Sequence, residues 1–220
     1  QKKEISKQRD YAEAQRDQIM HQRDEIQSSI TYARRIQFAA LPPEEVMNTM
    51  LDEYFIYNRH RDIVSGDFYW VKQVQDHLVI VSADCTGHGV PGAFMSMLGI
   101  TLLNDLIGER CYDAPSAILE SLRMKIKDML VQEGHADEQK DGMDMALCVL
   151  DLKNNTMQYA GANSPLYLIR GGGNEPQLEE FKPDLMPIAK GLSSGYLPIG
   201  GVMVAKRVAD VLIGHGGEFF

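Results

Sequence analysis

The chain has 220 residues, 44% of them hydrophobic and 24% charged, an ordinary globular mix that argues against a disordered, collagen-like or fibrous protein. Its net charge of −9 argues against nucleic-acid binding, and no apolar run reaches the ~18 residues of a membrane helix. The three cysteines are scattered and form no CxxC pair, which predicts reduced thiols in a cytoplasmic protein and argues against a zinc site.

The N-terminal stretch is predicted to form one long helix. Residues 1–41 contain neither Gly nor Pro, and Pro42 and Pro43 then end the helix. Residues 1–43 carry a net charge of +2 and the remainder −11, so we expect a mildly basic helical linker at 1–43 and an acidic domain at 44–220.

A seven-residue period runs through this helix. The triplet Gln-Arg-Asp recurs at 8–10, 15–17 and 22–24. One seam with the same period is apolar, and it consists of Ile5, Ala12, Ile19, Ile26, Ala33 and Ala40. The companion seam is mostly polar, which predicts a weak parallel coiled coil that dimerises the chain and can change register. The alternative is a solvated single helix.

Beyond the linker, the pattern predicts an α+β domain in which helices cover antiparallel sheets. Strands rich in β-branched and aromatic residues are expected at 54–57, 67–74, 77–83, 145–152, 157–160 and 166–170. Helices are expected at 93–107 and 114–132. Turns at 75–76 and 154–155 would join the neighbouring strands into hairpins.

Two aspartates are expected to meet at one end of the first hairpin. A turn at 75–76 pairs residues whose numbers sum to about 151, which places Asp67 opposite Asp84. Opposed carboxylates repel each other unless a cation neutralises them, and oxygen ligands favour Mg²⁺ or Mn²⁺ over zinc. Two aspartates that merely cap turns remain the alternative.

The ordered motifs of the chain resemble the SpoIIE/RsbU branch of the PPM-type metal-dependent serine/threonine protein phosphatases. The resemblance rests on Ser65-Gly-Asp-Phe-Tyr69, Ala83-Asp-Cys-Thr-Gly-His-Gly-Val-Pro-Gly-Ala93, and the helix segment Tyr32–Pro42. Further similar segments follow in family order at 141–148, 160–170 and 182–188. The resemblance covers about residues 28 to 188 and implies a β-sandwich flanked by helices.

The same resemblance implies a site with two Mn²⁺ or Mg²⁺ ions. Asp84 would bridge the ions, the backbone carbonyl of Cys85 would bind one, and Asp67 would bind the other. A water activated by the ions would attack the phosphorus of a phosphoserine or phosphothreonine. His88 is a candidate general acid for the leaving alkoxide, with a helix cap near Val90 as the alternative.

Two further pairs of residues are weaker candidates for the site. Asp141 and Asp144 precede or begin a predicted strand, where a turn carboxylate in solvent competes with a third metal contact. Arg61 and Asp62 are candidates to place a substrate phosphate, although an exposed ion pair is the simpler interpretation.

The chain departs from the family pattern near its C-terminal end. The family's later Ser-Asp-Gly motif is absent, and Ser193-Ser-Gly195 echoes it with Ser194 in place of the metal-binding Asp. A truncated or spliced chain, a degenerate non-catalytic module and an unidentified last ligand are the three explanations. The absence of a Met at position 1 favours an excised part of a longer protein.

The leading hypothesis is a bacterial signalling phosphatase controlled by its dimerising N-terminal helix. The resemblance implies a phosphorylated regulatory protein, such as an anti-sigma-factor antagonist, as substrate, and the chain would be cytoplasmic or the cytoplasmic part of a larger sensor. The alternatives are a dimeric signalling scaffold without turnover and a tethered ligand-binding domain of the PAS or GAF sort. The second of these leaves the Asp67/Asp84 pairing unexplained.

Overall fold

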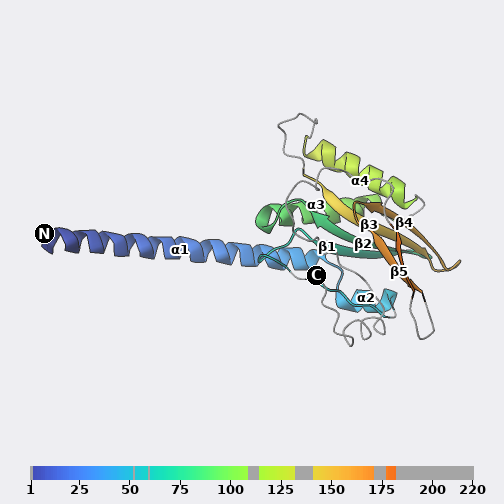
Figure 1. Ribbon diagram of the computed structural model, residues 1–220, viewed down its shortest axis with the longest axis horizontal. Coiled ribbons are helices and arrows are strands. Elements are labelled where there is room, and N and C mark those ends of the chain that lie inside the picture. The colour runs from blue at the N-terminus through green and yellow to red at the C-terminus, as the bar shows by residue number, and fades with distance from the viewer. Residues whose placement is uncertain are drawn as a thin grey trace.

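The computed structural model describes residues 2–51, 53–58, 60–108, 114–131, 141–170 and 177–181. Four helices and six strands lie in these ranges, in an α+β arrangement with antiparallel sheets, as predicted (Figure 1). The helices are α1 (Lys2–Ala40), α2 (Glu44–Met50), α3 (Gly89–Leu106) and α4 (Pro115–Met129). The strands are β1 (Phe68–Val74), β2 (His77–Cys85), β3 (Met143–Asp151), β4 (Thr156–Ala162), β5 (Leu166–Arg170) and β6 (Gln177–Phe181).

The main sheet has four antiparallel strands in the order β1-β2-β3-β4, and β5 and β6 pair separately. The first hairpin has the predicted register, because Phe68 pairs with Ala83 and Val74 pairs with His77. Gln75 adopts a positive φ of 56° in the turn between the two strands. The register of β2 against β3 places Asp84 opposite Asp144, a pairing across the two intervening helices that the hairpin pattern alone does not reveal.

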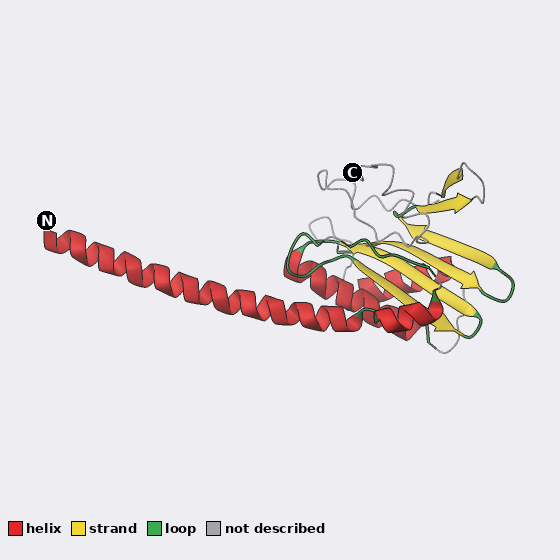
Figure 2. Cartoon of the chain, turned by 90° about the horizontal axis from the view of Figure 1, so that it is seen from below, coloured by secondary structure: helices red, strands yellow, loops and turns green. Residues whose placement is uncertain are grey.

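Helices α3 and α4 cover one face of the main sheet (Figures 1 and 2). Apolar residues of α3 interdigitate there with alternate residues of the strands, as Ile100 and Leu103 do with Val79 and Val81. Helix α4 adds Ile118, Leu122 and Ile126, whose spacing of four residues puts them on one side of that helix. The side chains between these helices and the sheet form the main hydrophobic core of the domain.

The opposite face of the sheet is partly covered by α2 and the segment after it. Met47 packs with Val71 and Leu78, and Tyr54 and Ile56 lie against this smaller cluster. The predicted strand at 54–57 is therefore wrong: within the described residues this segment pairs with no strand, and its apolar side chains instead pack on the sheet face. Helix α2 and strand β6 were not predicted.

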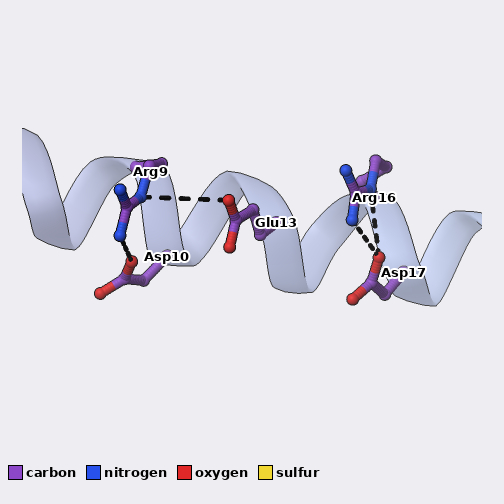
Figure 3. Close-up of polar contacts among 5 residues, drawn as sticks. All are labelled: Arg9, Asp10, Glu13, Arg16 and Asp17. Atoms are coloured by element: carbon purple, nitrogen blue, oxygen red, sulfur yellow. Dashed lines mark hydrogen bonds and ion pairs between the residues drawn. The ribbon is translucent and has the colours of Figure 1, made fainter.

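Helix α1 is 39 residues long, and its N-terminal part extends away from the rest of the molecule (Figures 1 and 2). Its surface there carries short-range ion pairs, including Arg9 with Glu13 and Arg16 with Asp17 (Figure 3). Its last turns contact the domain next to α3, and Ile63 of the domain lies near Ile26 and Ile30 farther out on the helix. In the part of the chain that the structure describes, no helix has the length and apolar character needed to cross a membrane.

Candidate metal centre

Three aspartates lie in a row across one end of the main sheet. Asp84, near the end of β2, pairs with Asp144 of β3. Asp67 directly precedes β1, and extending the β1–β2 ladder by one residue beyond Phe68 places Asp67 opposite Asp84. Residues directly opposite each other project from the same face of a sheet, so the three carboxylates share the face away from α3 and α4.

Asp144 lies in a different environment from the one expected for a turn carboxylate in solvent. It is the second residue of β3 and is only 8% exposed, so that interpretation is wrong. Asn163 donates a hydrogen bond from Nδ2 to its carboxylate at 3.0 Å. Because β3 begins at Met143, Asp144 belongs to the ladder beside Asp84 rather than to the preceding loop. Asp141 remains outside the strand and is half-buried.

Close backbone packing brings the loops that carry Asp67 and Asp84 together. A Cβ on Gly66 would lie 3.0 Å from the carbonyl oxygen of Gly87 and 3.2 Å from that of Cys85. A Cβ on Gly92 would lie 2.6 Å from the same Gly87 oxygen. A side chain at residue 92 would therefore force the backbone apart, one at 66 would be tightly packed, and the carbonyl oxygens of Cys85 and Gly87 lie next to the residue that precedes Asp67.

Thr86 holds the residue that directly precedes β3 through three hydrogen bonds. Its backbone N–H and its hydroxyl both point to the carbonyl oxygen of Gly142, at 2.9 and 3.1 Å, and the N–H of Gly142 donates back to the hydroxyl at 3.0 Å. These bonds join the residue after Cys85 to the residue after Asp141. The loop that leads into Asp144 is thereby tied to the end of β2.

The side chain of His88 does not cap α3, although the residue stands at its N-cap position. Its Nδ1 instead lies 2.8 Å from Oδ2 of Asp62. Both side chains are largely exposed to solvent. The interpretation of His88 as a helix cap is therefore wrong, because its side chain makes no capping hydrogen bond. Arg61 and Asp62 are exposed as expected, and Asp62 is hydrogen-bonded to His88.

Gln37 of α1 is a polar side chain inside the domain, only 5% exposed. Its Oε1 accepts a hydrogen bond from the N–H of Ser65 at 3.1 Å, and its Nε2 donates to the carbonyl oxygen of Ser65 at 2.5 Å and to Oγ of Ser96 at 2.8 Å. Ser65 Oγ in turn accepts the N–H of Asp67 at 3.0 Å. No local sequence pattern predicts a role for Gln37, because its partners lie 28 and 59 residues away.

The donor set suits a hard divalent cation. It consists of carboxylates and main-chain carbonyl oxygens, which favour Mg²⁺ or Mn²⁺. The side chain of Cys85 is buried in the core below the sheet, so only its carbonyl is available at the site. Within the described ranges, no three His, Cys, Asp or Glu side chains form a group that could hold a metal ion. The described donors fit the cation but do not complete its coordination.

A cysteine nucleophile is not part of this arrangement. Burial raises the pKa of the Cys148 thiol to about 11, so this thiol is protonated at neutral pH. Cys148 lies on β3 opposite Ile80, away from the strand end that carries the aspartates.

Comparison with known proteins identifies a family and several solved structures with a similar fold. A family model for stage II sporulation protein E (SpoIIE) matches residues 75–190. The SiaA-PP2C domain of Pseudomonas aeruginosa is 30% identical, with a TM-score of 0.65 over 83% of this chain and 68% of that chain. The PP2C phosphatase domain of SpoIIE from Bacillus subtilis is 18% identical, with a TM-score of 0.43 over 70% of this chain and 42% of that chain.

A second, short similarity is to aminotransferases. The putrescine–pyruvate aminotransferase of Pseudomonas aeruginosa is 63% identical over 38 residues, which is 17% of this chain and 8% of that enzyme. The chloroplastic gamma aminobutyrate transaminase 3 of Solanum lycopersicum is 61% identical over 38 residues, or 7% of its length. The chain thus spans less than a tenth of these curated relatives.

Proposed function

Because the chain belongs to the SpoIIE family of PP2C-type phosphatases, we propose that it hydrolyses phosphoserine or phosphothreonine in a bacterial signalling protein. The cofactor would be Mn²⁺ or Mg²⁺, and the substrate a phosphorylated regulatory protein such as an anti-sigma-factor antagonist. The observation that carries the proposal is the pairing of Asp84 with the buried Asp144 at the same sheet end as Asp67.

Asp67, Asp84 and the carbonyl of Cys85 would hold the cations, with Asp144 beside them. Divalent cations in such sites lower the pKa of a coordinated water and offset the charge that develops on phosphoryl oxygens. Asp62 orients the imidazole of His88 through Nδ1, which leaves Nε2 to deliver a proton to the leaving alkoxide. His88 is exposed enough to reach a protein-bound phosphate.

Asp84→Asn tests the site because it removes one negative charge and keeps the size of the side chain. We expect Mn²⁺-dependent hydrolysis of a phosphoserine peptide to fall at least about a hundredfold, since even outer-sphere changes cost metal sites 10–100-fold. The matched control is Asp76→Asn, in the exposed turn at the other end of the same hairpin. Equal activity and equal Mn²⁺ affinity in the two variants would remove the enzyme proposal.

Control by a dimerising helix is supported by the exposed apolar seam of α1. Ile5, Ile19 and Ile26 are 60–64% exposed, and the ion pairs of this part of the helix are local to it. A second copy of the helix would cover this seam. A change of register in such a pair would reach the domain through the last turns of α1.

The seam is tested by sedimentation of the full chain and of the double variant Ile19→Asp/Ile26→Asp. We expect a dimer for the wild type and a monomer for the double variant. Met20→Asp is the control, since Met20 is exposed on the same helix but lies off the seam. A monomeric wild type would exclude the dimer.

A dimeric scaffold without turnover is the second candidate. It is favoured by the lack of a three-residue metal-binding group among the described residues. Ser193–Gly195, where the family's closing motif is echoed, lies outside those residues. This candidate predicts a dimer that binds Mn²⁺ weakly and hydrolyses no phosphoserine peptide. A cytoplasmic location, alone or as part of a larger sensor, belongs to the same proposal for either candidate.

A further inference from the structure

We propose that Gln37 is a positioning residue, through which helix α1 holds the segment bearing Asp67 in the conformation that binds a divalent cation. The inference rests on the proposed function, because it concerns the metal centre that the aspartates would form. It assigns the connection between helix and site to one side chain and its hydrogen bonds.

The first step is that the side-chain amide of Gln37 makes three hydrogen bonds to buried partners. The side-chain amide uses its oxygen once and its nitrogen twice, and its partners Ser65 and Ser96 are both buried. Ser96 Oγ also lies 2.9 Å from the carbonyl oxygen of Ala93, to which it donates. The amide therefore joins α1, α3 and the segment before β1 at a single buried point.

The second step is the contact of this network with the backbone of Ser65. Gln37 binds both the N–H and the C=O of that residue. A peptide segment held at both groups cannot rotate about its own axis without breaking one of the bonds. The side chain thus fixes the orientation of the chain two residues before Asp67.

The third step leads from Ser65 to Asp67. Ser65 Oγ accepts the N–H of Asp67, and the intervening Gly66 packs against the carbonyl oxygens of Cys85 and Gly87. The segment is held by Gln37 on one side and by the loop after β2 on the other. Loss of the Gln37 bonds would release the first restraint and let Asp67 move relative to Asp84.

A merely structural role for Gln37 makes a different prediction. Buried polar groups left unsatisfied destabilise the fold whatever their location. In that case, removal of the side chain would lower the unfolding temperature measured in EDTA and leave the intrinsic Mn²⁺ affinity of the folded protein unchanged. Affinity for the metal alone therefore separates positioning from structural support.

The test compares Gln37→Leu with Gln18→Leu in the full chain. The two variants carry the same substitution on the same helix, and Gln18 is exposed. We expect calorimetric titration with Mn²⁺ to show at least about a tenfold loss of affinity for Gln37→Leu, the range found for residues that orient metal ligands. Gln18→Leu should bind like the wild type.

The possible outcomes distinguish this inference from the proposed function. A wild type that binds no Mn²⁺ overturns both. A wild type that binds Mn²⁺, together with a folded Gln37→Leu of unchanged affinity, overturns only the role of Gln37.

A second measurement needs no variant and covers the case in which Gln37→Leu does not fold. Coupling is reciprocal, so Mn²⁺ must stabilise the contact of α1 if that contact favours Mn²⁺ binding. We expect Mn²⁺ to slow amide hydrogen exchange in residues 34–40 of the wild type several-fold, with no change in residues 12–20. Equal exchange with and without bound Mn²⁺ in 34–40 would overturn the inference.

Discussion

The two ends of helix α1 invert the usual distribution of polar and apolar side chains. In the outer part, Ile19 and Ile26 are exposed, whereas at the inner end Gln37 is buried and fully hydrogen-bonded. Exposed apolar seams mark surfaces for another chain, and buried polar groups persist where their bonds specify one arrangement. One continuous helix thus carries two different features, an outer apolar seam exposed to solvent and an inner polar connection to the domain.

The largest expected effect contrasts an isoleucine of the core with one of the outer helix. Ile100 of α3 is 3% exposed and packs between the sheet and α4, while Ile26 is 60% exposed. We expect Ile100→Ala to lower the free energy of unfolding by about 2–5 kcal/mol, because it leaves a cavity in the core. Ile26→Ala should leave the unfolding of the monomer nearly unchanged.

Urea unfolding at several protein concentrations measures both variants. A loss for Ile26→Ala that grows with protein concentration would show that the outer seam is covered by a second chain. An equal loss for the two variants at every concentration would contradict the division of the molecule into a packed domain and an exposed helix.

The next effect concerns the glycine contact beside the aspartates. Gly92→Ala would place a Cβ 2.6 Å from the backbone oxygen of Gly87, whereas a Cβ on Gly108 meets nothing within 4 Å. We expect Gly92→Ala to cost about 1–3 kcal/mol of unfolding free energy, as overpacking does. Gly108→Ala should cost far less, and thermal unfolding of both variants checks the difference.

A Gly92→Ala protein as stable as Gly108→Ala would show that the loops at residues 66 and 87 can separate at little cost. The carbonyl oxygens of Cys85 and Gly87 would then not be fixed beside Asp67, and the inner region would lose the rigidity that distinguishes it from the outer helix.

Local patterns were sufficient to predict much of the fold. The position of the turn at 75–76 gave the register of β1 with β2, because a two-residue hairpin leaves one pairing that keeps the apolar residues on one face. The absence of Gly and Pro predicted α1, and apolar spacing predicted α3 and α4 to within a few residues of their ends. These features depend on residues close together in the chain.

Features that depend on distant residues were missed. Asp144 faces Asp84 only because β3 returns beside β2 after two helices, so its burial has no local signal. The partners of Gln37 are similarly remote. Tyr54 and Ile56 have strand-like composition, yet a strand needs a partner, and these side chains pack on the sheet face instead. The start of α2 does have a local signal, because Glu44 and Glu45 follow Pro43 in its first turn, where negative charge favours a helix.

A pH-dependent effect is expected where the inner end of α1 meets His60. The ring of His60 packs edge-on against Phe38 of α1 at 5.7 Å between centroids. Burial, and to a lesser extent the nearby Arg34, lower the pKa of His60. Because the folded state disfavours the charged ring, its stability is intact above the unfolded pKa of about 6.5 and is lost as pH falls through the lower folded pKa.

His60→Phe removes this titration and keeps an aromatic ring against Phe38. We expect the variant to lose less stability than the wild type between pH 7.5 and 5.0 in urea unfolding. The control His21→Phe, on the exposed outer helix, should follow the wild type. Parallel curves for wild type and His60→Phe would show that His60 is not held in its neutral form by the contact with α1.

The smallest effect is expected at the ion pairs of the outer helix. Arg16 lies 2.9 Å from Asp17, but both side chains are about two-thirds exposed, so water and salt screen their attraction (Figure 3). We expect Arg16→Gln to leave thermal unfolding unchanged within error at 0.15 M salt. A measurable, salt-sensitive loss of thermal stability would mean that the outer helix also stabilises the domain. The two ends of α1 would then differ only in how much each contributes to that stability. An unchanged value leaves the outer helix free to exchange partners or register without altering the fold at its inner end.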